Sequence, residues 1–369
     1  MMRSVFTVRA TLHVTLLCPY PTRLELYSGC SHSCVYCYRS WVKRVPAVSP
    51  ELAERALRKV AERLGEVPVP VRLSTLADPL QPAEARRRRT LRALAALRKL
   101  RAPVIVSTKS SLVAEEPYLS LLAEMADERL AVVQVTASLP PDAAAKLEPG
   151  APGVADRVHA VRELSRAGVP CALRLQPYVP GVSDSWLTEL VSMMLDAGVR
   201  HVIADGLRAP TEAELRRVYR AVGADVPSVF TSSGAGALVA SRKRLAEVFS
   251  AVAETCRRKG ASFATCKTGL LQLHTTQDCC TGGLIDACRR LTMVEVYFTS
   301  RRLGREVELS ESLGEKVLQG TELSGTPLDM SRHYRRLVKL WSQPDRVRAA
   351  TGSLIYVDGR YAAAEVLAC

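Results

Sequence analysis

The chain of 369 residues contains no asparagine and no apolar run long enough to cross a membrane. A membrane-spanning helix needs roughly 18 or more uninterrupted apolar residues, so the sequence predicts a protein without a membrane span. The N-terminal stretch carries Arg3, Arg9 and His13 and lacks a small-x-small cleavage site, so we expect no secretory signal and a cytoplasmic location. Missing asparagine combined with abundant arginine is typical of heat-adapted proteins and indicates a thermophilic source.

The charge is strongly positive, with 51 lysine and arginine residues against 37 acidic ones and a formal net charge of +14. Such a surplus attracts polyanions over long range and releases counterions when phosphates bind. Composition therefore favours nucleic acid as the large partner. With 47% hydrophobic and 24% charged residues the chain resembles an ordinary globular protein, and its length excludes a small disulfide-stapled scaffold.

Eleven cysteines stand in a chain for which we expect no secretion signal. Because reducing compartments disfavour structural disulfides, cysteines in such a chain more often bind metal or take part in redox chemistry. The cysteines are therefore the first residues to inspect for function.

The first 206 residues alternate short β-rich runs with amphipathic helical stretches, a pattern typical of βα units that form a parallel sheet. The stretches between the runs are long enough to hold a crossover helix. The six predicted strands are 24–27, 69–73, 104–107, 131–137, 171–175 and 201–204. The sequence therefore predicts the α/β class, as a partial (β/α)6 TIM-like barrel with a smaller cysteine-containing C-terminal α+β region.

The pattern becomes less regular after residue 210, where helices are expected at 211–221 and 236–259. Near the C-terminus, an Asp-Gly pair at 358–359 between two β-rich runs is typical of a hairpin turn. We divide the chain into an N-terminal extension (1–22), the barrel core (23–209), a helical extension with a cysteine cluster (210–290) and a small α+β tail with the hairpin (291–369).

The strongest motif is a C-x3-C-x2-C run formed by Cys30, Cys34 and Cys37, directly after the first predicted strand. In a parallel βα barrel the loops after the strands form the functional face, so these thiolates are expected at the mouth of the sheet. Three thiolates can hold three irons of a cubane cluster and leave the fourth iron open for a ligand. A structural zinc site normally has four ligands, and His32 is the nearby candidate for the fourth.

A strand, Gly29 and a C-x3-C-x-aromatic-C run, followed by βα repeats, resemble the radical S-adenosylmethionine (SAM) superfamily. The resemblance implies that Cys30, Cys34 and Cys37 act in catalysis by holding a 4Fe-4S cluster whose open iron chelates the amino and carboxylate groups of SAM. It also implies reductive cleavage of SAM to methionine and a 5′-deoxyadenosyl radical, with a ferredoxin or flavodoxin as reductant. Tyr36 occupies the position at which the family places an aromatic residue beside adenine. The cofactor supplies the chemistry, and the protein places it.

Four segments that follow predicted strands narrow the resemblance to the spore photoproduct lyase-like branch. These segments are 74–84, 107–110, Ser138 and 177–181. In that branch a lysine and a serine at the matching positions contact the SAM carboxylate, which points to Lys109 and Ser138. An ammonium and a hydroxyl also suit a carboxylate on physical grounds.

Two further residues are candidates for cofactor binding, each with an alternative. Asp78 at a strand end suits the ribose hydroxyls of SAM or the substrate; alternatively, it caps a helix near Pro79. Arg174, inside the fifth predicted strand, faces the lumen and SAM; alternatively, it forms a salt bridge within the barrel.

The sequence also departs from the lyase itself. The lyase returns a hydrogen atom from a cysteine just before the segment that resembles residues 75–78, and this chain has no cysteine between Cys37 and Cys171. The departure argues against dimer-repair chemistry. Cys171 would replace that cysteine only if its side chain reaches the lumen; the alternative is a buried cysteine that packs as a small hydrophobe.

A second cysteine-rich stretch lies downstream. Cys266, Cys279, Cys280 and Cys288 are candidates to close an auxiliary 4Fe-4S or zinc site, and the Thr-Gly-Gly turn at 281–283 supplies the backbone freedom that such a wrap requires. Adjacent cysteines do not easily form an unstrained disulfide with each other, which favours metal. Free thiols or disulfides to other partners are the alternatives.

Two basic stretches are candidates for phosphate contact. The stretch 81–110 holds nine basic residues and one acidic residue, with four consecutive arginines at 86–89. It is either a solvated outer helix or a phosphate-binding patch near Asp78. The stretch 332–348 includes Tyr334 and Trp341, which either stack on exposed bases or pack into the small domain.

Our first hypothesis is a radical SAM enzyme that abstracts hydrogen from nucleic acid or a nucleotide-derived substrate at the open end of the barrel. A base in a duplex would have to leave the stack to reach a radical inside the barrel. The first alternative is a peptide or small-molecule substrate, with the second cysteine group as electron relay or substrate anchor. The second alternative is a non-catalytic zinc or iron-sulfur protein that binds nucleic acid.

Overall fold

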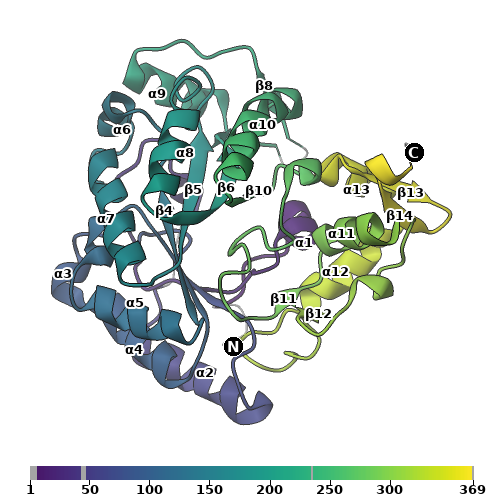
Figure 1. The fold of residues 1–369 in the computed structure, drawn as a ribbon, viewed down its shortest axis with the longest axis horizontal. Coiled ribbons are helices and arrows are strands. Elements are labelled where there is room, and N and C mark those ends of the chain that lie inside the picture. Colours follow the sequence, from purple (N-terminus) through teal and green to yellow (C-terminus); the bar gives the residue numbers. More distant parts are fainter. Residues whose placement is uncertain (1–5, 43–46, 234–235, 368–369) are drawn as a thin grey trace.

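A seven-stranded sheet in which every neighbouring pair is parallel dominates the computed structural model, which describes residues 6–42, 47–233 and 236–367. Its strands, in sheet order, are β1 (Arg23–Leu24), β2 (Val71–Leu73), β3 (Val104–Thr108), β4 (Ala131–Thr136), β5 (Cys171–Tyr178), β6 (Val199–Gly206) and β10 (Ser262–Thr265). The sheet curves around an inner face, and helices cover its outer face (Figure 1). The predicted fold, a partial TIM-like barrel with a further C-terminal region, is therefore confirmed.

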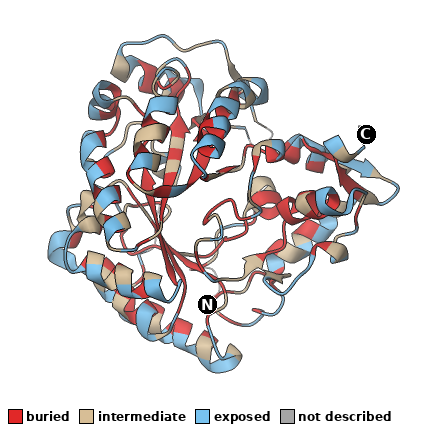
Figure 2. Cartoon of the chain, viewed as in Figure 1, coloured by how far each residue is buried: buried red, intermediate tan, exposed pale blue. Residues whose placement is uncertain are grey.

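The helices on the outer face are buried on the side toward the sheet and exposed on the opposite side (Figure 2), and the buried side carries apolar residues. They are α2 (Pro50–Leu64), α3 (Glu84–Arg87), α4 (Arg89–Lys99), α5 (Tyr118–Asp127), α6 (Pro141–Leu147), α7 (Val154–Arg166), α8 (Leu187–Asp196), α9 (Glu212–Val222) and α10 (Arg242–Arg258). Short 3₁₀ turns, η1 (Tyr38–Trp41) and η2 (Ser111–Ala114), lie in the connections after β1 and β3. Local sequence sets their ends. The Ser49 side chain accepts the Leu52 N–H at the start of α2, and Gly65 ends that helix in the left-handed region, at φ +80°.

All six predicted strands are present, but the sheet has a seventh, β10, which pairs with β6. It lies beyond residue 209, so the sheet continues past the predicted end of the barrel core; the domain boundaries otherwise stay predictions. The helix expected from residue 236 begins at Arg242, because Leu238–Ala240 form β9 between β7 (Arg208–Ala209) and β8 (Phe230–Ser232). Pairing with β8 nearby and with β7 further away along the chain makes this segment a strand.

The C-terminal region packs around its own apolar core together with the N-terminal helix α1 (Leu12–Leu17), which contacts α11, α12 and α13 (Figure 1). Its elements are η3 (Leu271–Leu273), β11 (Arg289–Arg290), α11 (Met293–Leu303), η4 (Ser310–Ser312), β12 (Val317–Leu318), α12 (Ser331–Trp341), α13 (Pro344–Thr351), β13 (Leu354–Val357), β14 (Arg360–Ala363) and η5 (Ala364–Val366). The hairpin turn is confirmed, because Asp358 and Gly359 both have positive φ between antiparallel β13 and β14. None of the described helices meets the length and apolarity of a membrane span.

The inner face of the sheet carries a small separate cluster of buried residues. Ile105 of β3 and Val132 of β4, both near the starts of their strands, pack there against Cys279, Cys280 and Ile285. The chain around residues 279–285 therefore fills the inner side of the sheet near the N-terminal ends of these two strands. The loops at the carboxyl ends of the strands are left to form a site.

Candidate active site

The three cysteines of the C-x3-C-x2-C run lie in the loop after β1, at the carboxyl edge of the sheet. Cys30, Cys34 and Cys37 are partly exposed free thiols and are electrostatic neighbours of one another. Burial, reinforced by the charges of Glu148 and the other two cysteines, raises the pKa of Cys34 to about 12, while Lys109 opposes the shift. Metal coordination would deprotonate such a thiol outright.

The described side chains offer no site for a single metal ion at these thiols. Within residues 6–42, 47–233 and 236–367, no three Cys, His, Asp or Glu side chains lie close enough to share one metal ion. A cubane takes one thiolate at each iron, so its ligands stand further apart than the ligands of one ion. The assignment of Cys30, Cys34 and Cys37 to three irons of a 4Fe-4S cluster stays a prediction.

Two residues outside the loop hold its backbone in place. The Gln81 side chain accepts the Ser31 N–H at 2.9 Å and donates to the Gly29 carbonyl at 2.8 Å. On the other side, the Gly150 N–H donates to the His32 carbonyl at 3.1 Å. A Cβ at Gly150 would lie 2.2 Å from the Ser31 carbonyl oxygen, so only glycine permits this approach.

Asp78 joins three of the loops at this edge. Its carboxylate accepts the Thr108 hydroxyl and the Lys109 N–H, both at 2.7 Å, and lies 3.4 Å from His32 Nδ1. Its own N–H donates to Cys30 Sγ at 3.4 Å. Burial would raise the pKa of Asp78, but His32 and the donated hydrogen bonds outweigh burial and lower it. Asp78 thus organises the cysteine loop, and its predicted contact with ribose or substrate stays a prediction.

A buried charge network stands beside the cysteine loop. Glu148 accepts hydrogen bonds from the Tyr36 hydroxyl and from Arg157, and Lys109 Nζ lies 3.9 Å from its carboxylate. The same ammonium lies 5.6 Å from the centroid of the Tyr36 ring. Burial would lower the pKa of Lys109, but Glu148 and Cys34 outweigh burial and raise it, so the side chain stays cationic. Sequence reasoning missed Glu148 and Arg157, which no local motif marks.

Ser138 carries an unsatisfied hydroxyl in the loop after β4. Its Oγ is buried and has no hydrogen-bond partner among the described residues, and the same holds for His32 Nε2. A buried polar group without a partner costs about 1–3 kcal/mol, so a polar ligand at this position would remove a penalty. The orphaned hydroxyl and the ammonium of Lys109 fit the carboxylate of an amino-acid cofactor such as SAM.

Arg174 lies on β5 and points to the inner side of the sheet. Its guanidinium donates to Gln134 Oε1 at 3.3 Å and lies 4.0 Å from Cys266 Sγ. The salt-bridge alternative is not observed, because in the described part of the chain no carboxylate forms an ion pair with Arg174. Its predicted role toward SAM stays a prediction.

The structure separates the predicted auxiliary cysteines. Cys279 and Cys280 share the inner cluster, and Cys279 is an electrostatic neighbour of Cys266. Cys288 instead donates its N–H to the Pro68 carbonyl and lies near Glu66, Asp286 and Lys316. Cys288 is therefore not brought together with the other three. Cys18, which the sequence analysis did not single out, is an electrostatic neighbour of Cys280 and Cys266.

Cys171 does not face the inner side of the sheet. It packs in the main core between sheet and helices, its Sγ lies 3.4 Å from the Val169 carbonyl, and burial raises its pKa to about 12. The packing alternative therefore describes Cys171, and it offers no hydrogen-atom donor to a lumenal substrate.

Known protein families include one whose model matches the part of the chain that carries this site. The family model for the radical SAM superfamily matches residues 24–194. Residues 24–194 therefore carry a radical SAM domain. The radical SAM family implies a 4Fe-4S cluster and SAM, so the match supports the predicted family and enzyme class over the non-catalytic alternative.

Similar proteins match only part of this chain, and this chain spans only part of them. An uncharacterized protein of Mycobacterium tuberculosis is 27% identical over 203 residues, 51% of this chain and 59% of that protein. A radical SAM Nalpha-GlyT isomerase of Pseudomonas phage M6 is 28% identical over 130 residues, 33% of this chain and 27% of the isomerase. A spore photoproduct lyase variant with bound AdoMet and dinucleoside spore photoproduct aligns with a TM-score of 0.51 and 16% identity over 66% of this chain and 76% of its own. The last likeness supports the predicted lyase-like branch at the level of the fold.

Proposed function

We propose that Cys30, Cys34 and Cys37 hold a 4Fe-4S cluster and that the protein uses SAM bound there to abstract hydrogen from a substrate. The observation that carries the proposal is the unpartnered buried hydroxyl of Ser138 after β4, next to the strand whose following loop places the ammonium of Lys109 beside Cys34 and Tyr36. When bound, the cluster supplies the electron that cleaves SAM to a 5′-deoxyadenosyl radical. A ferredoxin or flavodoxin is the proposed reductant.

The protein's own groups act by binding and orientation. Lys109 and Ser138 would hold the carboxylate of SAM, because a fixed ammonium and an unsatisfied hydroxyl both favour an anionic oxygen acceptor. Glu148 keeps Lys109 charged and in place, and it also orients the Tyr36 ring through the phenol hydroxyl. Asp78 keeps the loops after β2 and β3 at a fixed distance from the cysteines.

The test is formation of 5′-deoxyadenosine by the anaerobically reconstituted protein given dithionite and SAM. We expect product from the wild type and from Cys288→Ala, a cysteine far from the loop, and no product from Cys34→Ala. Ser138→Ala should still form product but bind SAM more weakly. Absence of product from wild-type protein with an intact, reducible cluster would contradict the proposal, and so would product from Cys34→Ala.

For the substrate, we propose nucleic acid or a nucleotide-derived molecule. Arg86, Arg87 and Arg88 are exposed, and none of them forms an ion pair within the described part of the chain. They lie on and just after α3, in the same connection after β2 that carries Asp78. Unpaired guanidiniums beside a site suit phosphate contacts, which position a nucleic acid without reading its sequence.

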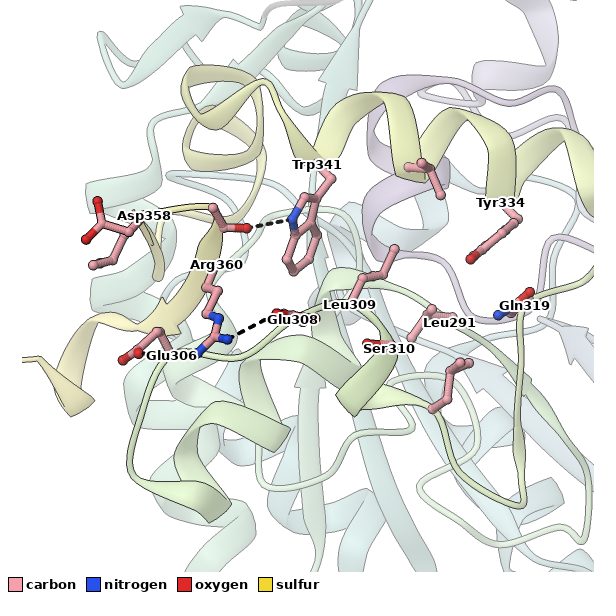
Figure 3. A pocket seen from close by; sticks show the side chains of 14 residues that line it. Leu291, Glu306, Glu308, Leu309, Ser310, Gln319, Tyr334, Trp341, Asp358 and Arg360 are labelled. Carbon is pink, nitrogen blue, oxygen red and sulfur yellow. Dashed lines mark hydrogen bonds and ion pairs between the residues drawn. The ribbon is translucent and has the colours of Figure 1, made fainter.

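The second basic stretch supports nucleic acid less well. Trp341 packs against Tyr361 with ring centroids 4.6 Å apart, and its Nε1 donates to the Gly359 carbonyl. With Tyr334 it lines a pocket of about 680 Å³ whose wall also includes Glu306 and Glu308 (Figure 3). These carboxylates would repel phosphates, so we place the nucleic-acid contact at the arginines after β2.

Salt-dependent binding of a single-stranded DNA oligonucleotide tests the substrate class. Each phosphate contact contributes about 0.7 to the slope of log K against log salt, so Arg86→Ala/Arg87→Ala/Arg88→Ala should lower the slope by about two. A matched control replaces three exposed basic residues on outer helices, Lys99, Arg162 and Arg258, by alanine and should leave the slope nearer to wild type. Equal losses in both variants, or binding that salt does not weaken, would favour a peptide or small-molecule substrate.

A further inference from the structure

Four cysteines from three distant segments meet at the inner face of the sheet. Cys18 directly follows α1, Cys266 directly follows β10, and Cys279 and Cys280 are neighbours in one turn. Cys18 is an electrostatic neighbour of Cys280 and Cys266, and Cys279 lies within hydrogen-bonding reach of Cys280 and close to the other two. We propose that Cys18, Cys266, Cys279 and Cys280 hold a second iron-sulfur cluster, distinct from the one proposed on the loop after β1.

The charges around these thiols point to an anionic group. Arg72 is buried and donates to Cys280 Sγ at 3.1 Å, and Arg174 lies 4.0 Å from Cys266 Sγ. Both guanidiniums also share Gln134 Oε1, each at 3.3 Å. In the described ranges neither guanidinium forms an ion pair with a carboxylate, although buried charges are normally paired. A cubane with four thiolate ligands is an anion overall and would supply the missing counter-charge.

The turn that carries Cys279 and Cys280 is preorganised by hydrogen bonds. The Asp278 carboxylate accepts the Cys280 N–H at 3.2 Å and the Tyr20 hydroxyl at 2.8 Å, and Gln134 donates to the Cys280 carbonyl at 2.6 Å. Gly282 follows in the left-handed region, at φ +64°, where a Cβ would lie 2.8 Å from the His201 ring. The turn is thus fixed from several sides, as a ligand site on a rigid support requires.

The backbone of Cys18 and of Cys266 is also fixed by hydrogen bonds. Arg290 is fully buried, and its guanidinium donates to the Cys18 carbonyl at 2.9 Å, to the Thr15 carbonyl at 2.7 Å and to the Val14 carbonyl at 2.9 Å. It therefore ties the end of α1, and Cys18 with it, into the C-terminal region. The Cys266 N–H donates to the Ala204 carbonyl at 2.8 Å, which extends the register of β10 against β6.

A cluster fits these cysteines better than zinc does. No three of the described Cys, His, Asp or Glu side chains are near enough to one another to share a single ion, while a cubane needs one thiolate per iron. Four protein thiolates would leave no open iron, so the second cluster would transfer electrons and would not bind substrate. This inference does not depend on the reaction proposed for the first cluster.

The test removes the first cluster and counts the iron that remains. After anaerobic reconstitution, Cys30→Ala/Cys34→Ala/Cys37→Ala should retain about four iron and four sulfide per chain and give an electron paramagnetic resonance signal on reduction. Adding Cys18→Ala should remove that iron and the signal. Adding Cys288→Ala, a cysteine of the same stretch that lies elsewhere, should leave both unchanged. Far-ultraviolet circular dichroism checks that each variant is folded.

Three results would overturn the proposal. The first is a folded triple variant without iron, and the second is one zinc per chain in place of iron. The third is iron that survives Cys18→Ala. Where Cys18→Ala does not fold, Cys280→Ser in the same background replaces it, with the same expectation. Because the triple variant lacks the loop cysteines, failure of the radical reaction does not affect this measurement.

Discussion

Replacing Glu148 by glutamine keeps the shape of the side chain and removes its charge. Glu148 is 2% exposed, accepts from Tyr36 and pairs with both Lys109 and Arg157. Removing one partner of a buried ion pair leaves uncompensated charge and typically costs about 3–5 kcal/mol. We therefore expect the free energy of unfolding of Glu148→Gln to be lower than that of the wild type by about this amount at pH 7.

The pH dependence of that difference follows from the sign of the shift. Burial would raise the pKa of Glu148, but Lys109 and Arg157 outweigh burial and hold it below its usual value of 4.5. A carboxyl group with a lowered pKa contributes stability above its unfolded-state pKa and loses it as pH falls through the folded-state pKa. The difference between wild type and Glu148→Gln should therefore be complete at pH 7 and shrink below about pH 4.5.

Urea-induced unfolding, followed by near-ultraviolet circular dichroism, measures both effects. Glu128→Gln is the control, because Glu128 pairs with Arg101 at the surface, where an ion pair contributes about 1 kcal/mol or less. Glu148→Gln/Lys109→Met should recover part of the loss, since it removes one of the two unpaired cations. A loss for Glu148→Gln no larger than that for Glu128→Gln would refute the reasoning.

Two further predictions concern the backbone of the cysteine loop. Gly150→Ala should lower both the iron bound at the loop and the yield of 5′-deoxyadenosine, because its Cβ would lie 2.2 Å from the Ser31 carbonyl; Gly29→Ala, with no atom within 4 Å of its Cβ, should keep both. Equal iron content in the two variants would contradict this. Gln81→Leu leaves the Ser31 N–H and the Gly29 carbonyl without their partner, so urea unfolding should show a loss of about 1–3 kcal/mol, and an unchanged midpoint would show that the clamp is dispensable.

Local sequence pattern was sufficient to predict most strands of the barrel, but it did not predict the strand at the edge of the sheet. The six predicted strands are apolar runs, and three of them follow a helix that ends at Gly65, Gly168 or Gly198, so these signals lie within or beside the segments themselves. The seventh strand, Ser262–Thr265, is only four residues long, and it is a strand because β6 offers an unpaired edge. The helix expected from residue 236 starts late for the same reason, since Leu238–Ala240 pair with strands on both sides.

The site residues likewise fall into those that the sequence could predict and those that it could not. The cysteines of the loop after β1 are close in sequence, so their spacing alone predicted a shared ligand. Glu148 lies 112 residues from Tyr36, and no periodicity connects the two. Cys18 and Cys280 likewise come from opposite ends of the chain, and the sequence grouping placed Cys288 where the fold places Cys18. Only the closure of the sheet brings these residues together.

The surroundings of the loop cysteines and of the inner group, Cys18, Cys266, Cys279 and Cys280, favour different functions for the two proposed clusters. The loop cysteines are partly exposed and stand beside the ammonium of Lys109, which pairs with Glu148. The unsatisfied Ser138 hydroxyl follows β4, the neighbour of the strand that Lys109 follows, so this edge of the sheet offers hydrogen bonding to a further ligand. The inner group has four thiols, two guanidiniums without carboxylate partners and a backbone fixed on every side. A site with three thiolates and an orphaned donor suits an open iron that binds a cofactor, whereas a site with four thiolates and matching cations suits a closed cluster. Charge balance and hydrogen-bond satisfaction, more than cysteine number, thus distinguish a site that binds a ligand from one that carries electrons.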